Sequence, residues 1–372
     1  MRFVTRFSPV GLHFGSLDTR LLQLTGSPRG WTVRAAEVAP AQGATRHSQA
    51  ATALSTHLKG QILGKDVVLS TSASEAAMTV VPIESAQSDR LVAMLEEAAA
   101  RAIEDTEGIN YRYLPLPRSL QDANERDEYL LLCLGQSEQN RCTNASDALG
   151  LRTVGLEISA FPVARALTYG KREDKQAVGV LHLGFDHAFF GIAYQNEMRF
   201  LKAMERNGAD LLESMHQAAE PLEDVHSAQA MALGFLTEGQ GSAEATENED
   251  DSASSAANAS TMLAHVCRQA EEERGALMLR ALRTQGAALG QEVRACLRHF
   301  HARNPGIAVG EVELSGFGAG LPGLCSLLEQ TLKIDVELAQ PFTKIGIGAP
   351  AEVLREQHLW CAPLGLALRE EA

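Results

Sequence analysis

The chain has 372 residues, of which 45% are hydrophobic, and it carries a formal net charge of −14. A chain of this length exceeds one compact core, so we expect a soluble protein with more than one lobe. The acidic balance, without any basic stripe, excludes nucleic acid as a partner.

Two similar hairpin signals stand in the two halves of the chain. The apolar runs Val10–Leu12 and Leu21–Leu24 flank one glycine turn. The runs Val178–Leu181 and Phe189–Ala193 flank another. Each pair predicts a β-hairpin. Because strand signals alternate with helix signals along most of the chain, the sequence predicts an α/β fold.

Between the two hairpins, Asp66–Ser70 and Tyr129–Leu134 are typical of strands. The segment Ser88–Ile103 has apolar residues at helical spacing with Glu96 and Glu97 opposite them. This pattern predicts an amphipathic helix whose stripe faces a core.

The segment Thr237–Ser260 is rich in Gly, Ser, Ala and acidic residues. It lacks the apolar surface needed to offset the entropy of ordering, so we expect a mobile loop. The spacing of its acids does not match an EF-hand calcium loop. A long helical signal, Met262–Arg283, follows it.

A third glycine cluster spans Leu314–Gly323, after the strand-like Val312–Leu314 and before the helix signal Leu324–Leu332. Backbone N–H groups at such a helix start are suited to face a phosphate or an adenosine. Tight turns without a ligand are the alternative.

No run of ~18 apolar residues could span a bilayer, and Met1–Arg6 lacks the core of a signal peptide. The six cysteines are scattered without a Cys-x-x-Cys pair, which is typical of free thiols in a reducing compartment. We therefore expect a cytoplasmic protein without direct membrane insertion.

Five stretches, in this order, resemble motifs of the actin-like ATPase superfamily and, within it, of the PilM-like proteins of type IV pili and related secretion systems. They are similar to the first phosphate loop, an A-G-L…A-x-x-R-A segment, the second phosphate loop, the adenosine motif and the closing N-P-F and G-L-A-L-R motifs. The stretches are Val10–Ser16 with Arg20–Leu24, Leu149–Val154 with Glu157–Ala166, Val180–Gly184 with Asn207–Leu211, Leu314–Leu324, and Ala339–Phe342 with Pro363–Arg369. Together they cover nearly the whole chain.

The resemblance implies an actin-like (ribonuclease-H-like, duplicated) two-lobe α/β fold with an inserted subdomain of the 1C type. The implied first lobe is 1–81 with 148–176 and 341–372, and 82–147 is the inserted, partner-binding subdomain. The second lobe is then 177–236 with 306–340. A small subdomain, 237–305, carries the acidic loop 237–260.

The departures from the family motifs concern the nucleotide site. His13 and His182 stand where actin-like enzymes carry the aspartates that hold Mg²⁺ or its waters, and a hard cation prefers oxygen ligands. Phe317 replaces a glycine of the adenosine motif, and Ala295 replaces an arginine. The degenerate nucleotide-binding residues implied by the resemblance are His13, Gly15, Ser16, Arg20, His182, Gly184, Gly208, Ala295, Gly316, Phe317 and Gly318. We expect ATP and Mg²⁺ to bind weakly or not at all, no catalytic residues, and no required cofactor or metal.

Three alternatives stay open at this point. His13 and His182 could bind a transition metal together with Asp186 or His187. A working ATPase could use Asp18 or Asp186 in place of the lost aspartates. A cytoskeletal FtsA-like protein would need a basic amphipathic helix at its C-terminus, and the ending Arg369–Ala372 does not provide one.

The resemblance favours a cytoplasmic scaffold over an enzyme. It implies a pseudo-ATPase of a pilus or secretion platform, peripheral to the inner membrane, which captures the cytoplasmic tail of a PilN-like membrane protein through 82–147. It leaves self-association and the choice between pilus and secretion system open.

Overall fold

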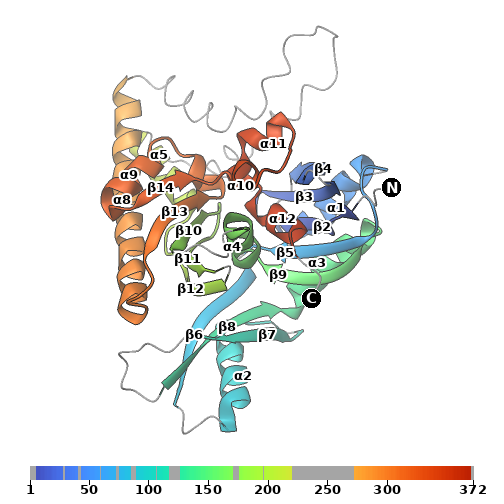
Figure 1. Cartoon of the computed structure of the whole chain (residues 1–372), viewed down its shortest axis with the longest axis horizontal. Coiled ribbons are helices and arrows are strands. Elements are labelled where there is room, and N and C mark those ends of the chain that lie inside the picture. The colour runs from blue at the N-terminus through green and yellow to red at the C-terminus, as the bar shows by residue number, and fades with distance from the viewer. Residues whose placement is uncertain are drawn as a thin grey trace.

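The computed structural model describes residues 6–27, 30–40, 43–58, 60–72, 75–84, 89–105, 107–116, 126–170, 176–195, 197–219 and 272–369. Two lobes lie side by side, and a smaller unit projects from one end of the pair (Figure 1). The acidic segment 237–260 and the start of the helix predicted from Met262 lie outside the described residues.

The first lobe is a mixed sheet with helices packed on it. Its strand order is β1-β3-β2-β5-β9, with β4 paired to β3. The strands are β1 Arg6–Phe7, β2 Val10–Phe14, β3 Asp18–Ser27, β4 Gly30–Pro40, β5 Asp66–Thr71 and β9 Arg152–Ile158. Helices α1 (Arg46–His57) and α3 (Gln136–Ala148) contribute to the same apolar core as these strands.

The second lobe repeats this plan with the order β12-β11-β10-β13-β14. Its strands are β10 Ala177–Leu183, β11 Ala188–Tyr194, β12 Glu197–Ala203, β13 Val309–Ser315 and β14 Asp335–Leu338. Its helices are α5 Gly208–Ala219, α8 Glu272–Arg303 and α9 Leu324–Leu332. Every residue of β10 is buried, as expected for a central strand covered on both faces. Helix α8 packs into the core of this lobe.

The two lobes share one strand pattern. In each, a hairpin (β2–β3 or β10–β11) is antiparallel, and its first strand pairs in parallel with a third strand (β5 or β13). The parallel registers correspond as well, because His13 lies opposite Ser70 and His182 lies opposite Ser315. Both predicted hairpins and the predicted duplicated α/β fold are confirmed.

The inserted unit is an antiparallel sheet, in the order β6-β8-β7, covered by one helix. It consists of β6 Ala76–Glu84, α2 Leu91–Ala102, β7 Ile109–Pro115 and β8 Arg126–Gly135. Leu95 and Ala99 of α2 are buried against this sheet, as the helical stripe predicts. The sheet starts at Ala76, whereas we expected a boundary at 82, because β6 and β8 pair along their whole length. Helix α3 packs against α1 in the first lobe, so the insertion ends near Gly135.

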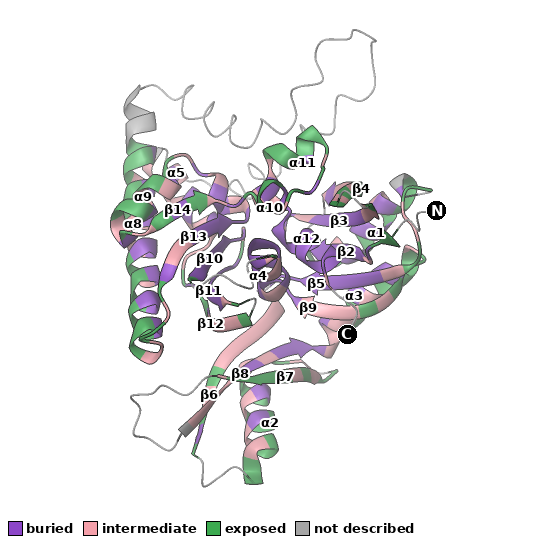
Figure 2. Ribbon diagram, in the orientation of Figure 1, coloured by how far each residue is buried: buried purple, intermediate pink, exposed green. Residues whose placement is uncertain are grey.

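Two helices lie between the lobes, α4 (Ala160–Thr168) and α12 (Cys361–Ala367), and both are almost wholly buried (Figures 1 and 2). The shorter α10 (Pro341–Ile345) and α11 (Ala351–Arg355) precede α12. The apolar core around α4 and α12 takes Leu22 from the first lobe and Phe189 from the second. This core therefore joins the two lobes. Among the described residues, no helix is both long and apolar enough to cross a membrane.

The crossing of α4 and α12 depends on Gly365, where an added Cβ would overlap the carbonyl oxygen of Pro162. We expect Gly365→Ala to destabilise the chain by about 3 kcal/mol, the upper end for overpacking, because the obstructing atom is backbone and cannot change rotamer. Urea unfolding followed by circular dichroism measures the change. Gly306→Ala is the matched control, since no atom lies within 4 Å of its added Cβ. Equal stability of the two variants would contradict a backbone-to-backbone contact at the crossing.

Candidate functional site: the cleft between the lobes

A cleft of about 70 Å³ opens where the two hairpin turns and the Gly316 turn meet. Typical ligand pockets measure roughly 300–1,000 Å³, so this cleft is narrow. The lining contains eight of the predicted nucleotide-site residues. The residues that line it are His13, Gly15, Ser16, Leu17, Asp18, Arg20, His182, Gly184, Phe185, His187, Gly316, Phe317 and Leu359.

The two histidines occupy equivalent positions at the carboxyl ends of central strands. His13 Nδ1 shares a hydrogen bond with Ser70 Oγ at 2.9 Å. His182 Nδ1 shares one with Ser315 Oγ at 3.0 Å. In both lobes the serine lies on the parallel neighbouring strand, as the last residue of β13 and the last but one of β5, so the same His–Ser pair occurs twice.

Both histidines are neutral in this environment. Burial, the nearby His187 and the cation of Arg20 together lower the pKa of His13 to about 4. Asp18 and a hydrogen bond with Ser70 raise this pKa and offset part of the shift. Burial, followed by His187 and His13, holds the pKa of His182 well below its usual value. Neutral imidazoles that already use Nδ1 for hydrogen bonds offer neither negative charge nor oxygen to Mg²⁺.

His187 completes the histidine cluster. Its Nδ1 lies 2.7 Å from Ser72 Oγ and 2.9 Å from Asp186 Oδ1, and its ring centroid is 5.3 Å from that of His182. Among the described residues, the group of three metal-ligating side chains with converging donor atoms lies elsewhere, in the first lobe. The cleft histidines therefore do not form the three-ligand set that the transition-metal alternative requires.

Arg20 is engaged within the protein. Its guanidinium donates to Asp18 Oδ2, with Nη2 at 2.7 Å and Nε at 2.8 Å, and lies over the ring of Trp360 at 5.1 Å from the centroid. Its residue exposure is 3%. Arg20 and Asp18 thus neutralise each other, although the buried Nη1 of Arg20 has no hydrogen-bond partner among the described residues.

The predicted base site contains an aromatic ring. Phe317 packs edge-on against Phe185, with ring centroids 5.7 Å apart. A Cβ added to Gly208 would lie 3.2 Å from the Phe317 ring and 3.3 Å from the nitrogen of Gly318, so these residues pack tightly at the start of α5. Ala295 is exposed on α8 and does not line the cleft, contrary to its predicted place in the site.

Some important cleft residues were missed or misread from the sequence. Ser315 falls inside the predicted glycine cluster Leu314–Gly323, but it ends β13 and shares a hydrogen bond with His182. Ser70 and Trp360 were not identified at all. A signal existed for the two serines, because each follows a leucine at the end of an apolar strand in its half of the chain.

Comparison with solved structures identifies the fold as actin-like. The chain is similar to "PilM-PilN type IV pilus biogenesis complex", with a TM-score of 0.68 and 18% identity, over 97% of this chain and 98% of that chain. It is also similar to the ethanolamine utilization protein EutJ from Carboxydothermus hydrogenoformans, with a TM-score of 0.50 and 12% identity, over 99% of this chain and 91% of that chain.

In sequence, residues 277–371 match the family described as type IV pilus assembly protein PilM. No curated protein matches the chain. The C-terminal match and the shared fold confirm the predicted resemblance to PilM, and the fold is that of the actin-like proteins.

Protonation of His13 should couple stability to pH. The pKa of His13 is about 4 in the folded chain and 6.5 at its usual value. Between these two pH values, the unfolded chain binds more protons at His13 than the folded chain does. Stability is therefore complete above pH 6.5 and falls as the pH decreases towards 4. At pH 5 we expect His13 to account for a loss of about 2 kcal/mol relative to pH 7.5.

The measurement is the free energy of unfolding in urea at both pH values for the native chain and for His13→Asn, which keeps a polar group near Ser70 but does not titrate. The variant should lose about 2 kcal/mol less than the native chain on acidification. Exposed His301→Asn is the control and should follow the native chain. An unchanged pH dependence in His13→Asn would refute the assignment.

Proposed function

We propose that the chain is a PilM-like pseudo-ATPase that acts as a scaffold of a type IV pilus or related secretion platform. It would lie on the cytoplasmic face of the inner membrane, held there by the cytoplasmic tail of a PilN-like membrane protein. The observation that carries this proposal is the match of residues 277–371 to the PilM family, together with the fold of a PilM that was solved with PilN.

The cleft supports a scaffold better than an ATPase. Neutral His13 and His182 replace anionic ligands, Arg20 is paired with Asp18, and Phe317 fills space beside the start of α5. Asp186, the other acid considered for an active enzyme, contacts His187. Each of these features opposes the binding of a magnesium–nucleotide complex.

A groove beside the inserted unit is our candidate site for the PilN-like tail. It encloses about 290 Å³ between β6 and β8 on one side and β12 and α8 on the other. Its floor is apolar and its rim carries charged and polar groups that suit a peptide backbone. The lining residues are Val80, Leu116, Glu128, Leu130, Arg199, Phe200, Leu201, His299, Phe300, Arg303 and Asn304.

The groove joins two parts of the protein that are separate in sequence. An ion pair between Arg303 of α8 and Glu128 of β8 links the second lobe to the inserted unit. A peptide bound there would contact both, so its affinity would report on their relative position. We propose that the chain is divided, as the resemblance implies, into two lobes and an inserted partner-binding subdomain, and that the tail binds where the subdomain meets the second lobe.

Titration calorimetry of the native chain with ATP and Mg²⁺ tests the pseudo-ATPase proposal. We expect no heat of binding at nucleotide concentrations up to about 1 mM, which corresponds to a binding free energy weaker than about −4 kcal/mol. The triple variant His13→Asp, His182→Asp, Phe317→Gly, which restores the family residues, is titrated beside it. Micromolar binding by the native chain would contradict the proposal, and binding by the variant alone would assign the loss to these three residues.

The tail-binding proposal is tested with Val80→Arg. Val80 lines the groove and is 42% exposed, so the substitution should not unfold the chain. A large charged side chain here should weaken binding of a synthetic PilN tail peptide from the same organism by at least about tenfold, because it obstructs the groove and removes apolar contact. Fluorescence anisotropy of the labelled peptide measures the affinity.

The matched control is Val154→Arg, another half-exposed strand valine, at 48% exposure on the edge strand β9. It should bind the peptide as the native chain does. If Val154→Arg weakens binding and Val80→Arg does not, the groove is the wrong surface and the tail lies along β9. If neither native chain nor variants bind, the partner proposal itself fails.

A further inference from the structure

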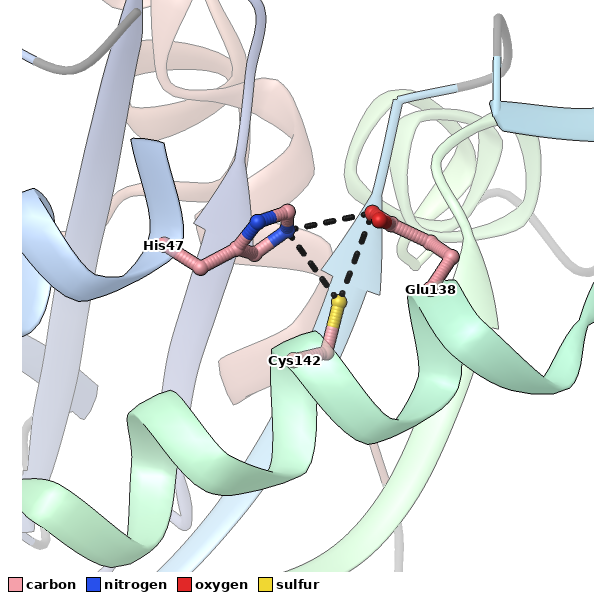
Figure 3. A group of neighbouring side chains, drawn as sticks. All are labelled: His47, Glu138 and Cys142. Atoms are coloured by element: carbon pink, nitrogen blue, oxygen red, sulfur yellow. Dashed lines mark hydrogen bonds and ion pairs between the residues drawn. The ribbon is translucent and has the colours of Figure 1, made fainter. Parts of the chain in front are cut away.

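Three ligand-type side chains meet in the first lobe, outside the cleft (Figure 3). His47 comes from the first turn of α1, and Glu138 and Cys142 lie four residues apart on one face of α3. All three residues are buried, with exposures of 4%, 2% and 0%. Within the part of the chain that the structure describes, this is the group of His, Cys, Asp and Glu side chains whose donor atoms converge.

The distances between the three donor atoms match one face of a zinc tetrahedron. His47 Nε2 lies 3.1 Å from Glu138 Oε1, and Cys142 Sγ lies 3.5 Å from His47 Nε2 and 3.6 Å from Glu138 Oε1. Tetrahedral angles with ordinary zinc bond lengths require about 3.3 Å between nitrogen and oxygen and about 3.5 Å between sulfur and either. A metal ion can therefore bind to all three atoms with little movement of the side chains.

We propose that His47, Glu138 and Cys142 form a zinc site that cross-links α1 to α3. Imidazole nitrogen, thiolate sulfur and carboxylate oxygen are the three ligand types that Zn²⁺ takes in proteins. As the bonds to zinc form, the thiol proton of Cys142 leaves to solvent, and the His47 proton moves from Nε2 to Nδ1 by exchange with solvent, so that Nε2 offers its lone pair to the metal. The fourth ligand is a water molecule.

Glu138 and the Cys142 thiolate would balance the two positive charges of the ion. Arg46 contacts both Glu75, at 2.8 Å, and Glu138 Oε1, at 3.3 Å, so a bound metal would replace its contact with Glu138 while the contact with Glu75 remains. Arg141 donates to the other carboxylate oxygen of Glu138 at 2.8 Å, and so leaves Oε1 directed towards His47 and Cys142. Thr71 donates to Oε1 at 2.6 Å, the kind of support that orients a ligating carboxylate.

The carboxylate of Glu138 is held in place from both of its oxygens. Thr71 donates to Oε1, and Arg141 donates to Oε2 through Nε at 2.9 Å. A groove of about 480 Å³ lies between α1 and α3 and is bordered by His47, Ser48, Arg141 and Ala145. Of the three proposed ligands, His47 borders this groove, and Glu138 and Cys142 lie buried behind it.

The experiment uses the full chain, stripped with a chelator and titrated with Co²⁺, a spectroscopic substitute for Zn²⁺. We expect one Co²⁺ per chain, with the absorption of tetrahedral cobalt and a sulfur-to-metal charge-transfer band, both of which Zn²⁺ abolishes on addition. Cys142→Ser should lose the charge-transfer band, and His47→Gln should weaken the affinity by at least about tenfold. Cys296→Ser, which removes another buried thiol in the second lobe, is the matched control and should keep the band.

The absence of a charge-transfer band in the native chain, or its persistence in Cys142→Ser, would overturn the proposal. Circular dichroism shows whether each variant is folded. If Cys142→Ser does not fold, zinc K-edge absorption of the native chain decides instead. One sulfur with nitrogen and oxygen neighbours supports the site, and zinc without any sulfur neighbour overturns it.

Discussion

The rest of the structure depends on how closely two helices cross between the lobes. At Gly365 the backbone of α12 lies against the carbonyl of Pro162 in α4, and at Gly11 the β2 backbone lies against Pro363. Arg165 also donates to the Gly365 carbonyl at 2.8 Å. Contacts made by backbone atoms cannot relax by a change of rotamer, so they hold α12 at a fixed distance from α4 and β2. Helix α4 in turn contacts β10 and β11 of the second lobe.

A narrow cleft changes what its side chains can do. Because little water reaches them, His13 and His182 stay neutral and satisfy their Nδ1 atoms with Ser70 and Ser315. His182 also stacks on Phe189, with ring centroids 5.0 Å apart. The facing strand ends are thus stabilised by packing and neutral hydrogen bonds, without a bound dication. In an actin-like ATPase, these two strand positions would carry carboxylates directed at a metal. Here they carry imidazoles, and each imidazole faces the opposite lobe.

The sequence predicted the features that depend on local pattern. Alternating apolar runs and glycine turns identified β2, β3, β10 and β11, and their likeness in the two halves identified the duplication. The partners of the cleft histidines could not be predicted in this way, because Ser70 and Ser315 are placed by parallel registers between strands 57 and 133 residues apart. The contact of Arg20 with Trp360 is likewise set by tertiary packing. Motif resemblance assigned Arg20 to a phosphate, whereas its charge is balanced by Asp18 two residues away.

The cleft between the lobes and the cluster between α1 and α3 differ in the donor atoms that they offer to a cation. In the cleft, the available nitrogens are neutral and the nearby acids are engaged, Asp18 by Arg20 and Asp186 by His187. Glu138 is engaged as well, by Arg46 and Arg141, but its Oε1 atom lies within 3.6 Å of both an imidazole nitrogen and a thiol sulfur. Three donor atoms of the types that Zn²⁺ takes thus converge there, and one of them is a carboxylate oxygen. The donor atoms therefore favour a metal ion between α1 and α3 over a metal ion in the cleft. An actin-like ATPase would bind its cation in the cleft, so the two positions are different.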